Sequence, residues 1–259
     1  MGIFNRIYSD YLLPSRLKEY DALLQKANAN GYLHVTISQF YNLIQKGELS
    51  ADQKYFIHRH DIDTDVPTAR AMFEIEKKNG VKSSWYFRRS TIDIPLMREI
   101  HEYGSEVGYH YEELSDFCKK HRIKSVEKVK ENYEKIRSLF KKNFLDLEEQ
   151  CGFEIKSVAS HGDFVNRHLG LPNHSFVNQD LLKELAVDFE CYDEVLLKNY
   201  QNILSDTIYP SFYKPHNPFQ LIDEGKIRIY LLSHPRHWRK AIWINTIDNI
   251  QRFIEGLRY

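Results

Sequence analysis

The segment Tyr55–Asp63 reads YFIHRHDID, an apolar strand that runs into two carboxylates one residue apart. Side chains alternate across a strand, so Asp61 and Asp63 should leave the same face while Ile62 points away. Two acids on one face repel each other unless a positive group lies between them. A divalent metal bound to one acid would relieve this repulsion and leave the other acid free to accept a proton. A surface turn whose acids cap the next helix fits this segment equally well, so the rest of the chain must decide.

Strands and helices alternate along the chain around this segment. Pro67 suits the first turn of a helix that Gly80 would end, and Thr36 followed by Gln39 is typical of a capping box. The predicted strands are 55–60, 81–87, 105–110, 155–159 and 227–232; predicted helices lie within 15–46 and at 67–79, 95–103 and 124–142. Such a rhythm predicts parallel strands with helical crossovers. No linker, repeat or low-complexity segment interrupts it, so one α/β domain over residues 1–259 is expected.

Composition excludes several classes of protein. Thirty-six basic and 36 acidic residues leave no net charge, so no overall field attracts nucleic acid or anionic lipid. The three cysteines lack CxxC spacing, which favours reduced thiols in a reducing compartment. No stretch approaches the ~18 apolar residues of a membrane span, and a cytoplasmic location is expected. P-loop, GxGxxG and GxSxG patterns are absent from the sequence.

Four predicted strands end in ionisable residues at their carboxyl ends. These residues are Asp61 with Asp63, His110, His161 and His234. In parallel α/β folds the carboxyl ends of the strands meet at one edge, where active sites lie. Carboxylates and imidazoles together form a ligand set that Zn²⁺ and similar ions accept. The sequence therefore favours the metal site over the helix cap.

Three motifs in order resemble those of the polysaccharide deacetylases of carbohydrate esterase family 4, the NodB-like proteins. The Asp-x-Asp pair at 61–63 matches the first motif, GSEVGYH at 104–110 the second, and LLSH at 231–234 the last. The resemblance covers residues 55–238. It implies a single distorted (β/α) barrel of about seven parallel strands, with residues 1–50 as a helical N-terminal extension.

The resemblance also implies roles for individual residues. Asp61 would be the general base, Asp63 and His110 metal ligands, and His234 the general acid. The expected cofactor is a divalent metal, with Zn²⁺ favoured.

The chain departs from the family pattern at two places. Leu114 stands where family members usually carry a second metal-binding histidine, and Ser160-His161-Gly162 replaces an Arg-Pro-Pro motif. His161 is the favoured third ligand. Glu112 is an alternative, because it would share a face with His110 on an extended backbone, and a site without metal is another.

Four further residues are candidates for supporting roles. His60 alternates away from Asp61, which favours a buried, hydrogen-bonded structural role. Asp206 could orient an imidazole, although a turn-forming role is favoured. Arg236 and Trp238 are expected to bind substrate by hydrogen bonding to a sugar ring and stacking on it, with ordinary packing as the alternative for Trp238.

The resemblance implies metal-dependent hydrolysis of an N-acetyl group on an amino sugar or glycan precursor, in the biosynthesis of bacterial surface polysaccharide. A catalytically silent glycan-binding protein on the same fold is one alternative, motivated by Leu114. Another metal-dependent hydrolase acting on a different amide or on a phosphoester is a further one. Nucleic acid is not an expected partner.

Overall fold

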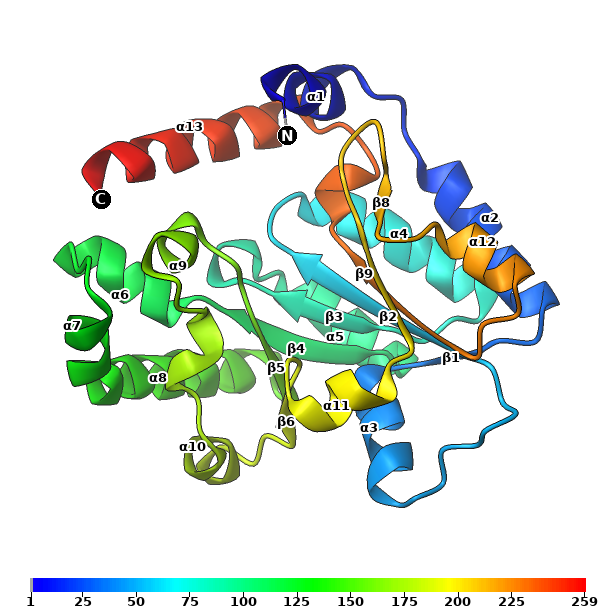
Figure 1. Cartoon of the computed structure of the whole chain (residues 1–259), viewed down its shortest axis with the longest axis horizontal. Coiled ribbons are helices and arrows are strands. Elements are labelled where there is room, and N and C mark those ends of the chain that lie inside the picture. Colours follow the sequence, from blue (N-terminus) through cyan, green and yellow to red (C-terminus); the bar gives the residue numbers. More distant parts are fainter. Residues whose placement is uncertain (1) are drawn as a thin grey trace.

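The computed structural model describes residues 2–259 and is built around one sheet of nine strands (Figure 1). The strands are β1 (Leu33–Val35), β2 (Tyr55–Ile62), β3 (Ser84–Phe87), β4 (Glu106–Tyr111), β5 (Ser157–Ser160), β6 (Phe189–Glu190), β7 (Asn202–Asp206), β8 (Tyr213–Lys214) and β9 (Arg228–Ser233). Every pair is parallel except β7 with β8. The predicted α/β class with a largely parallel sheet is confirmed.

The sheet is open within the described residues. Its order is β6-β5-β4-β3-β2-β9-β7-β8, with β1 beside the first half of β2, and no pairing joins β6 to β7 or β8 within residues 2–259. The gap between β6 and β7 holds an apolar cavity of about 330 Å³. The guanidinium of Arg59 lies against this cavity, 5.2 Å from the ring of Tyr192. The sheet therefore has nine strands, rather than about seven, and hydrogen bonds do not close it into a barrel.

Helices cover the sheet and connect its strands (Figure 1). The α-helices are α1 (Ile3–Ile7), α2 (Leu17–Ala29), α3 (Ile37–Gln45), α4 (Val66–Asn79), α5 (Ile94–Tyr103), α6 (Glu113–His121), α7 (Val126–Glu131), α8 (Tyr133–Cys151), α9 (Phe164–Leu169), α10 (Gln179–Glu184), α11 (Glu194–Asn199), α12 (Pro218–Asp223) and α13 (Ile242–Arg258). Short helical turns of other types are η1 (Tyr8–Leu12), η2 (Arg89–Thr91), η3 (Asn173–Phe176) and η4 (Pro235–His237). Among residues 2–259, no helix combines the length and the apolar character that a membrane crossing requires.

Local sequence signals explain several helix ends. Thr36 and Gln39 form the predicted capping box at the start of α3. Pro67 lies in the first turn of α4, and Gly80 ends that helix in the left-handed conformation that glycine adopts without strain. The helix predicted at 124–142 is divided at Asn132 into α7 and α8.

Two further differences concern the stretch after β5 and the N-terminal extension. The polar stretch 163–180, for which no helix was predicted, contains α9 and η3, because Asp163 and Asn166 form a capping box that starts α9. The first 50 residues are mainly helical, as expected, and also contribute β1 to the sheet.

The central strand β2 is buried at all eight positions, because both faces of the sheet are covered there. One face carries His60, whose Nε2 lies 2.8 Å from Oε1 of Glu76 on α4. Tyr20 on α2 donates a hydrogen bond of 2.5 Å to the same carboxylate oxygen. The buried, hydrogen-bonded structural role predicted for His60 is thus confirmed. The opposite face of β2 directs Arg59 and Asp61 toward the candidate site.

Candidate active site

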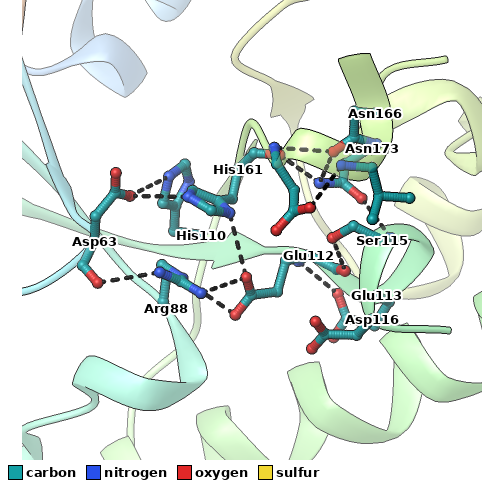
Figure 2. A network of polar contacts seen from close by, with 12 residues as sticks. Asp63, Arg88, His110, Glu112, Glu113, Ser115, Asp116, His161, Asn166 and Asn173 are labelled. Carbon is teal, nitrogen blue, oxygen red and sulfur yellow. Dashed lines mark hydrogen bonds and ion pairs between the residues drawn. The ribbon is translucent and has the colours of Figure 1, made fainter. Parts of the chain in front are cut away.

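Side chains from the ends of β2, β4 and β5 meet at the carboxyl edge of the sheet (Figure 2). Asp63 directly follows β2, His110 lies in β4, and His161 directly follows β5. One ligand atom from each of the three lies within 4.8 Å of the others, a grouping able to hold a metal ion. The structure therefore brings together the three residues predicted as metal ligands.

The hydrogen bonding of His110 leaves a lone pair directed at Asp63. Its Nδ1 lies 2.9 Å from the carbonyl oxygen of Ala159, so the proton of a neutral ring is assigned to Nδ1. Its Nε2 then faces Oδ1 of Asp63 at 3.2 Å, and that buried oxygen has no hydrogen-bond partner. Two acceptors in contact need a proton or a metal ion between them. The donor set and this unpartnered oxygen fit a divalent metal.

His161 is the third member of the cluster, whereas Leu114 is buried in the core on α6. Nε2 of His161 lies 3.6 Å from Oδ1 of Asp63, and its Nδ1 lies 3.2 Å from Oε2 of Glu112. Burial alone would lower the pKa of His161, but the carboxylates of Asp63 and Glu112 raise it to about 9. The two carboxylates therefore favour a positive charge at the imidazole of His161.

Glu112 lies next to the cluster but is not one of its three possible ligands. It receives two hydrogen bonds from Arg88, at 3.1 and 2.6 Å, and contacts the nitrogen of His161 that is farther from Asp63. Arg88 also donates to the backbone carbonyl of Asp63 at 3.2 Å. A carboxylate on the outer nitrogen of a histidine fixes the ring and its tautomer in many metal sites. This geometry gives Glu112 a supporting position behind His161 (Figure 2).

Asp61 lies on the same side of β2 as Asp63, as the alternation predicts. Its Oδ2 is 3.4 Å from Nε2 of His110. Arg59 donates to both carboxylate oxygens, at 2.7 and 2.8 Å. Burial would raise the pKa of Asp61, but the charge and the hydrogen bonds of Arg59 hold the pKa below its ordinary value. Sequence reasoning missed Arg59, although its position two residues before Asp61 places it on the same face.

His234 directly follows β9, and its imidazole is oriented by Asp206. Nδ1 of His234 lies 2.7 Å from Oδ1 of Asp206, and Oδ2 of Asp206 accepts from the His234 backbone N–H at 2.7 Å. The same carboxylate contacts His237 at 2.9 Å. Burial would lower the pKa of His234, but Asp206 and the more distant Asp61 and Asp63 raise it to about 9. His234 is accordingly a protonated group.

The turn-forming role favoured for Asp206 was wrong. This residue ends β7, and its carboxylate is hydrogen-bonded to His234, His237 and Trp238. The segment NILSD is short and polar, which explains why its strand was not recognised in the sequence.

The substrate-binding roles predicted for Arg236 and Trp238 were also wrong. Trp238 is fully buried, packs against Tyr20 at 5.1 Å between ring centroids, and donates from Nε1 to Asp206 at 2.9 Å. Arg236 donates two hydrogen bonds to the buried carboxylate of Asp10, at 3.0 and 2.7 Å, and is paired with Asp248. Neither side chain is free to touch a sugar.

A cavity of about 580 Å³ adjoins the cluster and provides room for a substrate. Asp63, Arg88 and His161 line it on the sheet side, while Asp248 and Arg252 line it from α13. This volume is typical of sites for small molecules. The cavity therefore extends from the possible metal ligands to the side chains of α13 that line it.

Comparisons with known proteins concern the fold. Neither the scan against protein-family models nor the search of curated proteins finds a match. Among solved structures, the chain is similar to the Streptococcus pyogenes deacetylase PplD in complex with acetate, with 12% identity, a TM-score of 0.47, and coverage of 92% of this chain and 90% of that one. It is also similar to IcaB from Ammonifex degensii, with 14% identity, a TM-score of 0.47, and coverage of 68% of this chain and 77% of that one.

Proposed function

We propose that this protein is a metal-dependent deacetylase that hydrolyses an N-acetyl group on an amino sugar. The observation that carries the proposal is the convergence of Asp63, His110 and His161 at the carboxyl edge of the sheet, with ligand atoms within 4.8 Å of one another. Asp61 and His234 flank this cluster as one unprotonated and one protonated group. Surface-polysaccharide biosynthesis as the setting comes from the motif resemblance alone.

Asp63, His110 and His161 would hold the metal, with Zn²⁺ as the ion that best suits one carboxylate and two imidazoles. When bound there, such an ion lowers the pKa of a coordinated water and polarises the amide carbonyl. Glu112 would keep the ring of His161 in place, and the carbonyl of Ala159 would do the same for His110.

The chain's own residues would move the protons. Asp61 accepts a proton from the attacking water, and the two hydrogen bonds from Arg59 fix its orientation for this step. His234 donates a proton to the nitrogen of the leaving amine, which is otherwise too basic to depart. Asp206 holds His234 in the protonated form and in a fixed direction.

The proposal is tested by incubating the purified protein with a panel of N-acetylated amino sugars and with a phosphoester, and measuring released acetate and phosphate. Acetate release that depends on a divalent ion is expected. Phosphate release alone would assign a different hydrolase activity. Binding of sugar by metal-free protein without acetate release would support the glycan-binding alternative.

Replacing the base separates its role from that of the ligands. Asp61→Asn is expected to lower kcat by about 10²- to 10⁴-fold, the usual contribution of a general base, while bound metal stays at the wild-type level. Elemental analysis and acetate release on the same preparation measure both quantities. Loss of metal in this variant would show that Asp61 is a ligand instead.

Glu112→Gln tests the support behind His161. The change removes the charge next to Nδ1 and is expected to weaken metal affinity by about 10- to 100-fold. Competition with a chelator of known affinity measures the change. Glu134→Gln, which removes an exposed carboxylate on α8 far from the cluster, is the matched control and should leave affinity unchanged. Equal affinities for both variants would contradict the supporting role.

A further inference from the structure

The C-terminal helix α13 turns its polar side toward the protein. Its one buried residue is Asn245, whose amide donates to the backbone carbonyl of Asp10 at 2.9 Å. Asn249 donates to the carboxylate of Asp10 at 3.1 Å, and Glu255 is paired with Lys119 at 3.2 Å. Polar contacts therefore fix this helix at both ends. An ordinary amphipathic helix on a domain instead turns its apolar side toward the protein.

The apolar side of α13 faces solvent. Seven large apolar side chains are between 39 and 81% exposed: Ile242, Trp243, Ile247, Ile250, Phe253, Ile254 and Leu257. At 3.6 residues per turn they fall within an arc of about 140°. Five of them, at 243, 247, 250, 254 and 257, follow the alternating four- and three-residue spacing of a seam between two packed helices.

The N-terminal helix α1 adds to this exposed apolar area. It lies beside the first turns of α13 at the same end of the molecule, and η1, which continues it, contacts α13 (Figure 1). Ile3, Phe4 and Ile7 are 46 to 81% exposed. We call the seven α13 side chains and these three the α13 surface.

The size of the α13 surface matches that of a protein interface. Taking roughly 150–200 Å² for each fully exposed large side chain, the α13 surface leaves on the order of 1,000 Å² of apolar area in water. The largest apolar patch of a typical monomer is about 300–600 Å², whereas each partner in a standard interface contributes about 800 Å².

We propose that the α13 surface is the interface of a homodimer, in which α13 packs against α13 of a second copy about a two-fold axis. A two-fold interface uses the same patch on both subunits, and the helix seam meets that requirement by itself. The charges favour a second copy over a lipid surface: α13 carries Asp248 and Glu255 against Arg252 and Arg258, and the whole chain has no net charge. Helices that bind membrane surfaces are instead rich in lysine and arginine on the polar face.

Dimerisation would also fix one wall of the candidate active site. The inner side of α13 lines the 580 Å³ cavity with Ile244, Asp248, Gln251 and Arg252, and Ile247, at the edge of the α13 surface, also borders it. A helix that its partner holds in place presents these side chains at a constant distance from Asp63.

Sedimentation velocity of the full chain tests the proposal. The wild type is expected at twice the monomer mass of 30.9 kDa, and Ile250→Glu at the monomer mass, because a charge in the seam would be buried without a partner. Leu145→Glu changes an apolar residue of α8 that is 44% exposed outside the surface, and it should remain dimeric. Circular dichroism establishes that each variant is folded. A wild type that sediments as a monomer at all concentrations, or a dimer that Ile250→Glu leaves intact, would overturn the proposal.

Trp243 provides a second readout that needs no variant. Trp85 and Trp238 are fully buried, whereas Trp243 is 81% exposed in the single chain. Acrylamide quenching of fluorescence should therefore be weak in the concentrated dimer and increase on dilution. Quenching that is strong and independent of concentration would contradict the dimer. Protection found only with phosphatidylcholine–phosphatidylglycerol vesicles would assign the surface to a bilayer instead.

Discussion

Asp63→Ala is expected to abolish retention of a divalent ion and to lower kcat/KM for acetate release by about 10³-fold or more. Asp63 supplies the only carboxylate oxygen facing both His110 and His161, at 3.2 and 3.6 Å, among the residues proposed as ligands. Without it, two imidazoles would have to hold the ion alone. A bound ion supplies several kcal/mol of transition-state stabilisation, and each 1.36 kcal/mol corresponds to a factor of ten in rate. Elemental analysis and acetate release on one preparation measure both effects.

Asp61→Asn is the matched control for Asp63→Ala, since it changes the other acid of the same pair. It should lose activity and keep the metal. Asp63→Ala protein that retained wild-type metal and activity would refute the assignment of this residue as a ligand.

Arg236→Ala is expected to lower the free energy of unfolding by about 3–5 kcal/mol, because it leaves the buried carboxylate of Asp10 without its main partner. Asp10 joins α13, η1 and the segment after β9, so the loss affects three parts of the chain. Urea unfolding measures the change. Lys198→Ala breaks an exposed pair with Glu194 and should leave the free energy of unfolding nearly unchanged.

The same ion pair predicts how stability changes with pH. Burial would raise the pKa of Asp10, but the hydrogen bonds and charge of Arg236 lower it below the ordinary value. A carboxyl with a lowered folded-state pKa stabilises the fold above its unfolded-state pKa, and this stabilisation is lost as the pH falls through the folded-state pKa. Arg236→Ala should therefore flatten the decline of stability in acid. An unchanged stability together with weaker sugar binding would instead restore Arg236 as a substrate-binding residue.

The sequence predicted the parts of the site that depend on local patterns. The alternation along 55–63 placed Asp61 and Asp63 on one side, and the rule that parallel strands end at one edge brought His110 and His161 to them. His161 could be favoured as the third ligand because a strand was predicted directly before it. Each of these inferences needs only the period of a strand and the order of the elements.

Contacts between distant segments were beyond such reasoning. Arg236 was expected to face a sugar because nothing near it in the sequence shows that Asp10 packs against it. Trp238 is buried by Tyr20, which is equally remote in sequence. The open gap between β6 and β7 depends on how a two-residue strand pairs, which no local pattern encodes.

The central claim is that a divalent ion at Asp63, His110 and His161 drives deacetylation, and one reconstitution experiment tests it most directly. The wild-type protein is purified, its metal content determined, the ion removed with a chelator, and Zn²⁺ added back while acetate release from an N-acetylated amino sugar is followed. We predict one divalent ion per chain, loss of acetate release on chelation and its recovery on addition of Zn²⁺. Acetate release that continues unchanged in metal-free protein would contradict the account.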